Sequence, residues 1–361
     1  MFGLDFKNLK NKLGLTETPI VLRVTMMGGR GAGKSSVLAS LAHNMQAVLE
    51  NTDLYMNADA VTKDVITSKF YELTRMFDNV KEGLDIPAAG IPGDEDVSTY
   101  AFKFGMNKTD SSMDVVFRDF PGEFIEREPQ QVKNYIEESN AVLIAIDTPH
   151  LMEEDGVYNE AKNCCSIITN FILDHLQETV SRKLILLVPL KCEKYYHAGQ
   201  MANVADKVEQ AYSELIEMLK RDHKTDVACA IIPIQTLGDV IFSHFGRDEQ
   251  GQVKTVKKMN SQLLLPVETE YRYRNSEAHY SPMDCEQPLY YLLTFMAKEY
   301  ERLRNEPPKT FMEILKKKIG GMFKLLSDNP EFLLQISRLK RKRKSVNREK
   351  GFVVLTGKNL I

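Results

Sequence analysis

Four short stretches of the chain are apolar almost without interruption. They cover residues 20–27, 140–147, 183–189 and 227–234. Runs of this length and composition are typical of strands buried on both faces of a sheet. Two further stretches, 98–106 and 113–119, alternate apolar and polar residues and lie close enough in sequence to form an antiparallel hairpin. The pattern therefore predicts six strands.

Between these strands, apolar residues recur every three or four positions, which is the spacing of helices. The predicted helices cover residues 35–49, 62–80, 129–138, 159–179, 203–221 and 288–304. Helices that alternate with strands predict a mostly parallel sheet between two helical layers. We therefore expect a P-loop-type three-layer α/β/α fold with a six-stranded sheet and one antiparallel hairpin strand. Its ligands should bind at the carboxyl ends of the strands.

The same pattern suggests a division of the chain into three parts. Residues 1–18 form a leader in which Phe and Leu alternate with Lys; we expect it to dock on the domain, and a helix on a membrane surface is the alternative. Residues 19–305 form the main domain, with insertions at about 51–98 and 238–284. Residues 306–361 are expected to be a basic helical appendage.

Composition narrows the class of protein. The chain has 361 residues, of which 43% are hydrophobic and 27% charged, as in soluble globular proteins. Its apolar runs are too short to span a bilayer. The five cysteines show no metal-ligand spacing and no disulfide framework. We therefore expect a cytoplasmic protein, with peripheral attachment to a membrane as an alternative.

The net charge of −3 conceals an uneven distribution. Residues 309–350 contain 13 Lys and Arg against 4 Asp and Glu, a net charge of +9, so the rest of the chain carries about −12. A basic tail of this kind suits an anionic membrane, a nucleic acid or an acidic protein. The aromatic–arginine run 271–274 offers a second route to nucleic acid by stacking on bases, although such runs more often pack on their own domain.

The residues after the first strand carry the clearest chemistry. They match G-x-x-x-x-G-K-[ST] and lie between a predicted strand and a predicted helix, which is the context of a phosphate-binding loop. Backbone N–H groups of the loop and the dipole of the helix attract phosphate, Lys34 contacts the terminal phosphates, and Ser35 is placed to bind Mg²⁺. The expected nucleotide-binding residues here are Gly28, Gly29, Arg30, Gly31, Ala32, Gly33, Lys34, Ser35 and Ser36.

A second element follows the hairpin. Asp119 ends an apolar strand and Gly122 stands three residues further on. The carboxylate suits the position that holds Mg²⁺ directly or through water, and the glycine N–H can reach the last phosphate. The sequence therefore predicts that Asp119 and Gly122 belong to the same site as Ser35.

Two later stretches, Leu190–Glu193 and Gln235–Gly238, complete the order of motifs found in GTPases. Over about residues 19–304 the chain resembles a TRAFAC-class P-loop GTPase and is most similar to the bacterial double-GTPase families, type two. The resemblance implies that Thr99 binds Mg²⁺, that Lys191 stacks on guanine, and that Glu193 accepts from guanine N1 and N2. It also implies that a backbone N–H of Gln235 or Thr236 meets guanine O6, and that a second GTPase is the partner, in a defence or stress system.

Three departures from the family's pattern concern specificity and rate. Glu193 stands where the family places aspartate, and Leu190 where it places asparagine. Glu123 stands where many relatives place the glutamine that orients water, so hydrolysis is expected to be slow without a partner. Arg30 lies inside the loop. One hypothesis is that it acts as an arginine finger, within one chain or in a nucleotide-dependent dimer. The alternative is that it forms a salt bridge at the surface of the loop.

The sequence thus predicts an Mg²⁺-dependent protein that hydrolyses GTP to GDP and phosphate and acts as a switch. Lys34, Arg30, Gly122 and Glu123 are the expected catalytic residues, and Ser35, Thr99 and Asp119 the metal ligands. Two other classes stay open. One is a sensor or scaffold that holds GTP with little turnover, and the other is an ATPase or kinase.

Overall fold

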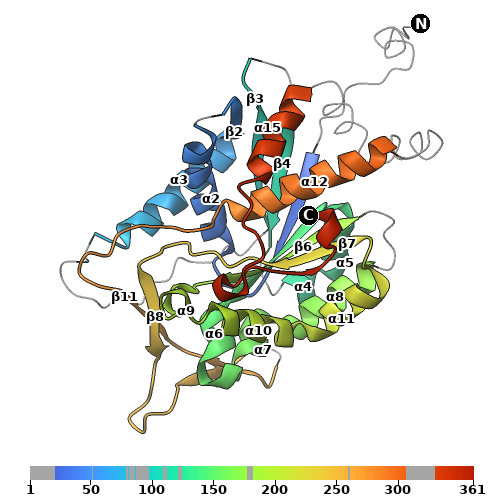
Figure 1. Cartoon of the computed structure of the whole chain (residues 1–361). Helices are drawn as coiled ribbons and strands as arrows, with labels where there is room; N and C mark the ends of the chain where they lie inside the picture. Colours follow the sequence, from blue (N-terminus) through green and yellow to red (C-terminus); the bar gives the residue numbers. More distant parts are fainter. Residues whose placement is uncertain are drawn as a thin grey trace, which may run out of the picture.

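The computed structural model describes residues 21–50, 52–78, 80, 86, 97–108, 112–120, 124–176, 182–258, 261–305 and 330–361. An eight-stranded sheet lies at its centre, in the order β12-β7-β6-β5-β1-β4-β3-β2 (Figure 1). The strands are β1 (Val21–Met27), β2 (Leu54–Ala58), β3 (Ser98–Met106), β4 (Ser112–Asp119), β5 (Ala141–Asp147), β6 (Lys183–Leu190), β7 (Val227–Ile231) and β12 (Val353–Thr356). Strands β1, β4, β5, β6 and β7 are parallel, whereas β3, β2 and β12 each run antiparallel to their neighbour.

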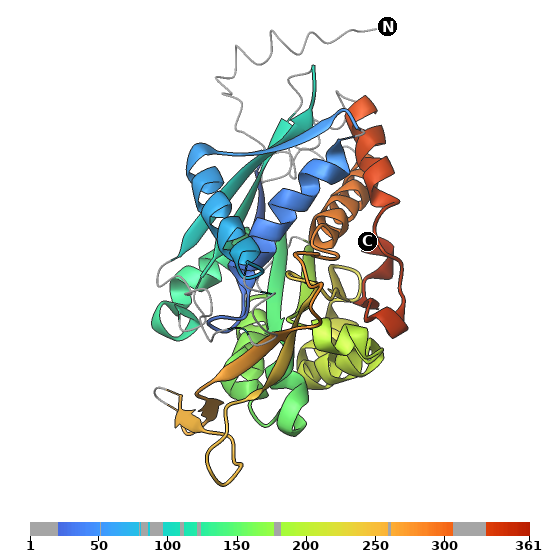
Figure 2. The same cartoon turned by 90° about the vertical axis from the view of Figure 1, so that its left-hand side faces the viewer.

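Helices cover both faces of this sheet (Figure 2). One layer comprises α2 (Lys34–Leu49), α3 (Ala60–Arg75), α12 (Gln287–Asn305) and α15 (Pro330–Lys340). The other comprises α5 (Pro129–Glu138), α8 (Cys165–Leu176), α10 (Met201–Ala211) and α11 (Ser213–Asp222). The predicted three-layer α/β/α fold is therefore confirmed.

Strand order determines where a site can form. The strand β1 lies between β4 on one side and β5 on the other. Strands that precede β5 in the chain extend the sheet one way, and those that follow extend it the other way. In open α/β sheets, ligands bind at such a reversal, beyond the carboxyl ends of the strands. The glycine-rich loop follows β1 directly and so begins at this point.

The sheet has eight strands where the sequence predicts six. The two additional strands, β2 and β12, lie at the two edges of the sheet. Both are short and half-exposed, with burial patterns that do not alternate cleanly. Their pairing with β3 and β7 therefore depends on tertiary contacts rather than on a local pattern.

Several predicted helices are divided or have different bounds in the structure. The predicted helix 159–179 is divided into α7 (Asn159–Asn163) and α8 by Cys164, whose φ is 53°. Helix 203–221 is likewise divided into α10 and α11 at Tyr212. Helix 62–80 is α3, which begins earlier because the Asp59 side chain accepts a hydrogen bond from the Thr62 N–H. These breaks depend on single capping or left-handed residues, which periodicity does not reveal.

Shorter elements connect the layers. They are α4 (Phe124–Arg127), α6 (Thr148–Met152), η2 (Glu153–Gly156), α9 (Glu193–His197), η3 (Arg348–Lys350) and η4 (Lys358–Leu360). The second insertion forms two antiparallel ribbons, β8 (Val240–Phe245) with β11 (Thr269–Tyr273) and β9 (Thr255–Lys257) with β10 (Leu264–Pro266). Figure 2 shows these ribbons, in orange and gold, at the lower end of the molecule.

The last described segment, 330–361, packs on the main body. Helix α15 lies against α12 (Figure 1), the Phe332 ring lies 6.0 Å from that of Phe104, and β12 joins the central sheet. Within the described ranges, no helix is both long and apolar enough to cross a bilayer. The division at residue 305 stays a prediction, and the leader 1–18 lies outside the described residues.

Candidate functional site

The loop after β1 has a backbone that needs glycine. Gly33 precedes α2 with φ of 105°, in the left-handed region. A Cβ atom at Gly29 would lie 1.9 Å from the Lys162 carbonyl oxygen, so the loop packs closely on α7. A side chain at either position would displace the loop. The spacing of glycines recognised in the sequence therefore corresponds to a backbone requirement.

Three predicted site residues converge at the start of α2. The Lys34 Nζ donates to the Gly28 carbonyl at 3.1 Å and lies 3.6 Å from Asp119 Oδ1. The Ser35 hydroxyl donates to Asp119 Oδ2 at 3.0 Å. Lys34 and Asp119 are 7% and 5% exposed. The carboxyl end of β4 thus meets the amino end of α2, as the motifs predict.

The chemistry of this cluster fits Mg²⁺. A serine hydroxyl and a buried carboxylate supply hard oxygen donors. Among the described residues there is no group of three or more His, Cys, Asp or Glu that could hold a metal. Mg²⁺ at phosphate sites needs only one or two protein oxygens, because phosphates and waters complete its octahedron. Ser35 and Asp119 are therefore the residues that would hold it.

Thr99 is not directed toward this cluster. It is exposed and pairs with Arg118 across the β3–β4 hairpin, whereas Ser98 pairs with Asp119. Residues directly opposite in an antiparallel pair point to the same face, and successive residues point to opposite faces. Ser98 therefore shares a face with Asp119, and Thr99 points to the other. The role of Thr99 as a metal ligand stays a prediction.

The other loop residues differ in exposure. Ala32 is fully buried, Ser36 is half-buried, and Arg30 and Gly31 are exposed. The Arg30 carbonyl accepts a hydrogen bond from Lys162 Nζ at 2.8 Å. The finger role of Arg30 stays a prediction. Gly122 and Glu123 lie outside the described residues, so their catalytic roles also stay predictions.

An ion pair between the half-buried Lys191 and the fully buried Asp147 joins the ends of β5 and β6 to the loop. Lys191, whose φ is 56°, donates to the Gly31 carbonyl at 2.7 Å and to Asp147 Oδ2 at 2.8 Å. Burial alone would raise the pKa of Asp147, but Lys191 and His150 hold it well below its ordinary value. The Asp147 carboxylate in turn raises the pKa of Lys191 above its ordinary value, against the effect of burial. Lys191 is therefore a fixed cation beside the phosphate loop.

Glu193 lies on the first turn of α9 and is 2% exposed. Its Oε1 accepts from the Leu237 N–H at 3.3 Å, which ties α9 to the loop after β7. Burial raises its pKa to about 7, and hydrogen bonds from backbone N–H groups act in the opposite direction. A carboxylate can accept about four hydrogen bonds in all, so these contacts do not exhaust Glu193.

Gln235 and Thr236 lie beside Glu193, in the loop after β7. Both are buried, at 3% and 6% exposure. Gln235 forms a two-way backbone bridge with Met283, and the Thr236 carbonyl accepts from the Ser40 hydroxyl at 3.3 Å. The structure thus places this loop between α2 and the segment before α12. Their contact with guanine O6 stays a prediction.

Two residues that the sequence analysis did not assign complete the charge pattern. Asp147 is fully buried beneath Lys191, and Lys162 on α7 reaches the loop at Arg30. Burial lowers the pKa of Lys162, Asp147 opposes this, and Lys191 and Lys34 add to the lowering. Three lysines, Lys34, Lys162 and Lys191, therefore lie around the loop, with the buried carboxylates Asp119 and Asp147 beside them. Asp147 could have been identified from its position in the sequence, because it is an aspartate at the carboxyl end of a predicted buried strand.

The aromatic–arginine run is turned into the protein. The Tyr273 hydroxyl donates to the Met76 carbonyl, and Arg274 Nε lies 2.7 Å from Asp239 Oδ1. Arg272 and Arg274 are exposed, whereas Tyr273 is buried. These contacts hold Tyr273 and Arg274 against the domain, so residues 271–274 do not form a continuous stacking surface for a nucleic-acid strand. The nucleic-acid alternative for this run is therefore not supported by its geometry.

The basic tail is partly neutralised by the body. Lys344 Nζ lies 2.6 Å from Asp284 Oδ1, and Arg348 pairs with Asp206 and Glu209. The Arg343 guanidinium lies 4.7 Å from the centre of the Tyr291 ring. Several basic residues that the sequence suggested for an outside partner therefore form ion pairs with acidic residues of the domain. Arg341 and Lys342 remain exposed.

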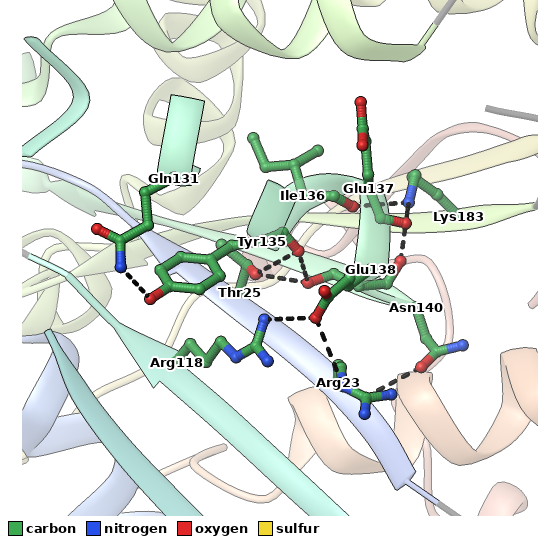
Figure 3. A network of polar contacts seen from close by, with 11 residues as sticks. Arg23, Thr25, Arg118, Gln131, Tyr135, Ile136, Glu137, Glu138, Asn140 and Lys183 are labelled. Carbon is green, nitrogen blue, oxygen red and sulfur yellow. Dashed lines mark hydrogen bonds and ion pairs between the residues drawn. The ribbon is translucent and has the colours of Figure 1, made fainter. Parts of the chain in front are cut away.

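A second polar network anchors the helix that follows Asp119 (Figure 3). Lys183 is fully buried and donates to the carbonyls of Ile136, Glu137 and Ser139 at 2.7, 3.2 and 2.8 Å. Arg118 donates to Glu138 at 2.9 Å. The carboxyl end of α5 is thus held to the sheet, and its amino end follows α4.

Comparisons with known proteins add little to this geometry. No protein-family model matches the chain, and no curated protein matches it significantly in sequence. Solved structures that it resembles include the signal recognition particle receptor SRb-GTP/SRX complex of Chaetomium thermophilum, at 14% identity and TM-score 0.35, over 62% of this chain and 94% of that chain.

Others are the S. cerevisiae Ski7 GTPase-like domain bound to GTP, at 16% identity and TM-score 0.34, and Methanosarcina barkeri Roco2 RocCORdC bound to GDP, at 12% and 0.26. These matches cover 65% and 61% of this chain, but less than half of each of those chains, 46% and 45%. At such TM-scores the likeness carries no argument about activity. The function is therefore argued from the site.

Proposed function

We propose that this chain is an Mg²⁺-dependent GTPase that hydrolyses GTP to GDP and phosphate and acts as a nucleotide-dependent switch. The observation that carries the proposal is the convergence of Lys34, Ser35 and Asp119 beyond β1 and β4, within a glycine loop. Such a cluster binds a polyphosphate and its metal ion. The three surrounding lysines suit the same ligand.

The residues of the chain have separate tasks in this proposal. Lys34 exchanges its carbonyl partners for phosphate oxygens, and Ser35 and Asp119 hold the metal ion, which neutralises charge that develops on the phosphates. Water attacks in line, with no covalent intermediate. Loss of the last phosphate then releases the segment after Asp119, and α5 stays anchored at its far end.

Guanine preference is proposed from Glu193. An ionised carboxylate can accept the N1 and N2 protons of guanine, and adenine has no donor at N1. Because burial raises the pKa of Glu193 to about 7, the group must release a proton before it accepts from guanine. GTP binding at pH 6 should therefore release a proton. Calorimetry in buffers of different ionisation enthalpy measures this release.

The test measures binding of GTP and of ATP by calorimetry with Mg²⁺, and phosphate release in the same samples. We expect GTP to bind more tightly, Lys34→Ala to abolish binding, and Asp119→Asn to weaken Mg²⁺-dependent binding about 10- to 100-fold. Ser35→Ala should weaken the same Mg²⁺-dependent binding, and its matched control is Ser68→Ala, on an exposed turn of α3. Equal or tighter binding of ATP would contradict the guanine assignment, and GTP binding without phosphate release would indicate a sensor.

A further inference from the structure

Tyr271 reaches the Lys191 site from the second insertion. It lies on β11, and the centre of its ring is 5.6 Å from Lys191 Nζ. The ring meets that of Phe242 edge to face at 6.1 Å, across the β8–β11 ribbon. An aromatic side chain therefore stands beside the lysine on which the base is proposed to stack, and a neighbouring ring fixes its orientation.

The backbone of the ribbon is irregular at this position. The pairing of β11 with β8 shifts register between Glu270 and Tyr271. A bulge of this kind bends a strand and redirects a side chain, and bulges are over-represented next to active sites. Tyr271 and Leu237 also pack in one apolar cluster, and the Leu237 N–H donates to Glu193. The β8–β11 ribbon thus packs against the loop that contacts Glu193.

The hydroxyl of Tyr271 is buried, and apart from the Lys191 ammonium beside it the described part of the chain offers it no hydrogen-bond partner. Burial raises the pKa of Tyr271, and the Lys191 ammonium opposes this, so the group stays a neutral donor. Buried hydroxyls normally have a partner, because an unpaired one loses its hydration without compensation. The site therefore holds a buried hydroxyl on which the charges of Lys191, Asp147 and Glu193 act, and whose own proton has no acceptor among the described residues.

We propose that Tyr271 forms a wall of the nucleoside pocket. Its ring packs on the nucleoside of the nucleotide held by Lys191, and its hydroxyl forms a hydrogen bond with that nucleoside. The inference rests on the proposed function and extends it, because it assigns a role in the nucleotide site to the insertion. Specificity for a nucleoside then depends on the ribbon as well as on the loops at the strand ends.

The experiment compares two ligands that share phosphates but differ in the nucleoside. Calorimetry measures binding of GDP and of inorganic tripolyphosphate, both with Mg²⁺. We expect Tyr271→Ala to weaken GDP binding about 10- to 100-fold, as loss of one aromatic–base stack does, and to leave tripolyphosphate binding unchanged. Tyr271→Phe should lose only part of this affinity. Arg272→Ala, exposed on the same strand, is the matched control and should bind both ligands as the wild type does.

The outcomes separate the two proposals. Unchanged or tighter GDP binding by Tyr271→Ala would overturn the inference while leaving the GTPase proposal in place, and tighter binding would mean that Tyr271 occludes the pocket. Equal loss of both ligands would show a structural role and would also overturn it. If the wild-type chain binds tripolyphosphate but not GDP, the proposed function fails as well.

Discussion

The surroundings of the Glu193 carboxyl group favour its protonated form. The side chain is 2% exposed, and its burial raises the pKa to about 7 from an ordinary value near 4.5. The folded chain therefore holds this proton more tightly than the unfolded chain does. The stability that the protonated group contributes is complete below about pH 4.5 and is lost as pH rises through about 7.

Glu193→Gln should remove this dependence on pH. At pH 8 we expect the nucleotide-free variant to be more stable than the wild type by about 2–3 kcal/mol, and at pH 5 the difference should shrink toward zero. Glutamine keeps an oxygen that accepts from the Leu237 N–H, so the loop contact survives. Urea unfolding at both pH values measures the difference.

The control for this prediction is Glu72→Gln, on an exposed part of α3. It should give the same free energy of unfolding as the wild type at each pH. A Glu193→Gln variant whose stability differs from that of the wild type by a constant amount at both pH values would contradict the proton-linked account. Guanine binding by the wild type should weaken on acidification in the same range.

The sequence predicts which residues lie together where a spacing rule applies. Lys34, Ser35 and Asp119 lie together because a strand, a tight loop and a helix leave few other arrangements. Asp147 and Tyr271 were not assigned, because their roles arise from contacts with Lys191 across long sequence separations. Such pairings depend on which strand ends become neighbours.

Helix α5 shows how an element is held by one buried side chain. The last carbonyls of a helix have no partner within the helix. Lys183, on the central strand β6, supplies three donors to the carbonyls of Ile136, Glu137 and Ser139 (Figure 3). The cost of burying an ammonium group is offset only if these bonds form. Lys183 thereby joins the carboxyl end of the helix to the sheet, beside the Arg118–Glu138 contact.

Lys183→Met keeps the length of the side chain but removes the donor that these three carbonyls share. We expect the free energy of unfolding to fall by about 2–4 kcal/mol, the cost of unpaired buried polar groups. Urea denaturation followed by circular dichroism measures it. Lys133→Met is the matched control, because Lys133 lies on α5 itself and pairs with Glu137 at 3.7 Å on the half-exposed side of the helix. Equal stabilities of the two variants would contradict the anchoring role.

At the scale of the whole molecule, residues 330–361 belong to the packed core. Phe352, at 1% exposure, lies in the same apolar cluster as α2 and α12. Strand β12 covers the edge of β7, which would otherwise be open to pairing with another chain. Lys344 and Arg348 add ion pairs to acidic residues of the domain.

Phe352→Ala should therefore destabilise the entire domain. We expect a loss of about 3–5 kcal/mol, as for other buried phenylalanines, and a single cooperative transition in thermal or urea unfolding. Val346→Ala, at a position 52% exposed in the same segment, should have little effect. If the segment were an independent appendage, Phe352→Ala would leave the main unfolding transition unchanged.

The sequence by itself determined the layered fold and the proximity of Lys34, Ser35 and Asp119, because buried strands, helical spacing and the glycine loop are local patterns with local physical causes. Only the tertiary structure decided the strands β2 and β12, the opposite face of Thr99, the partners of the basic tail and the position of Tyr271. These depend on long-range pairing at sheet edges and on buried charges that meet across the chain, and no window of sequence contains both partners.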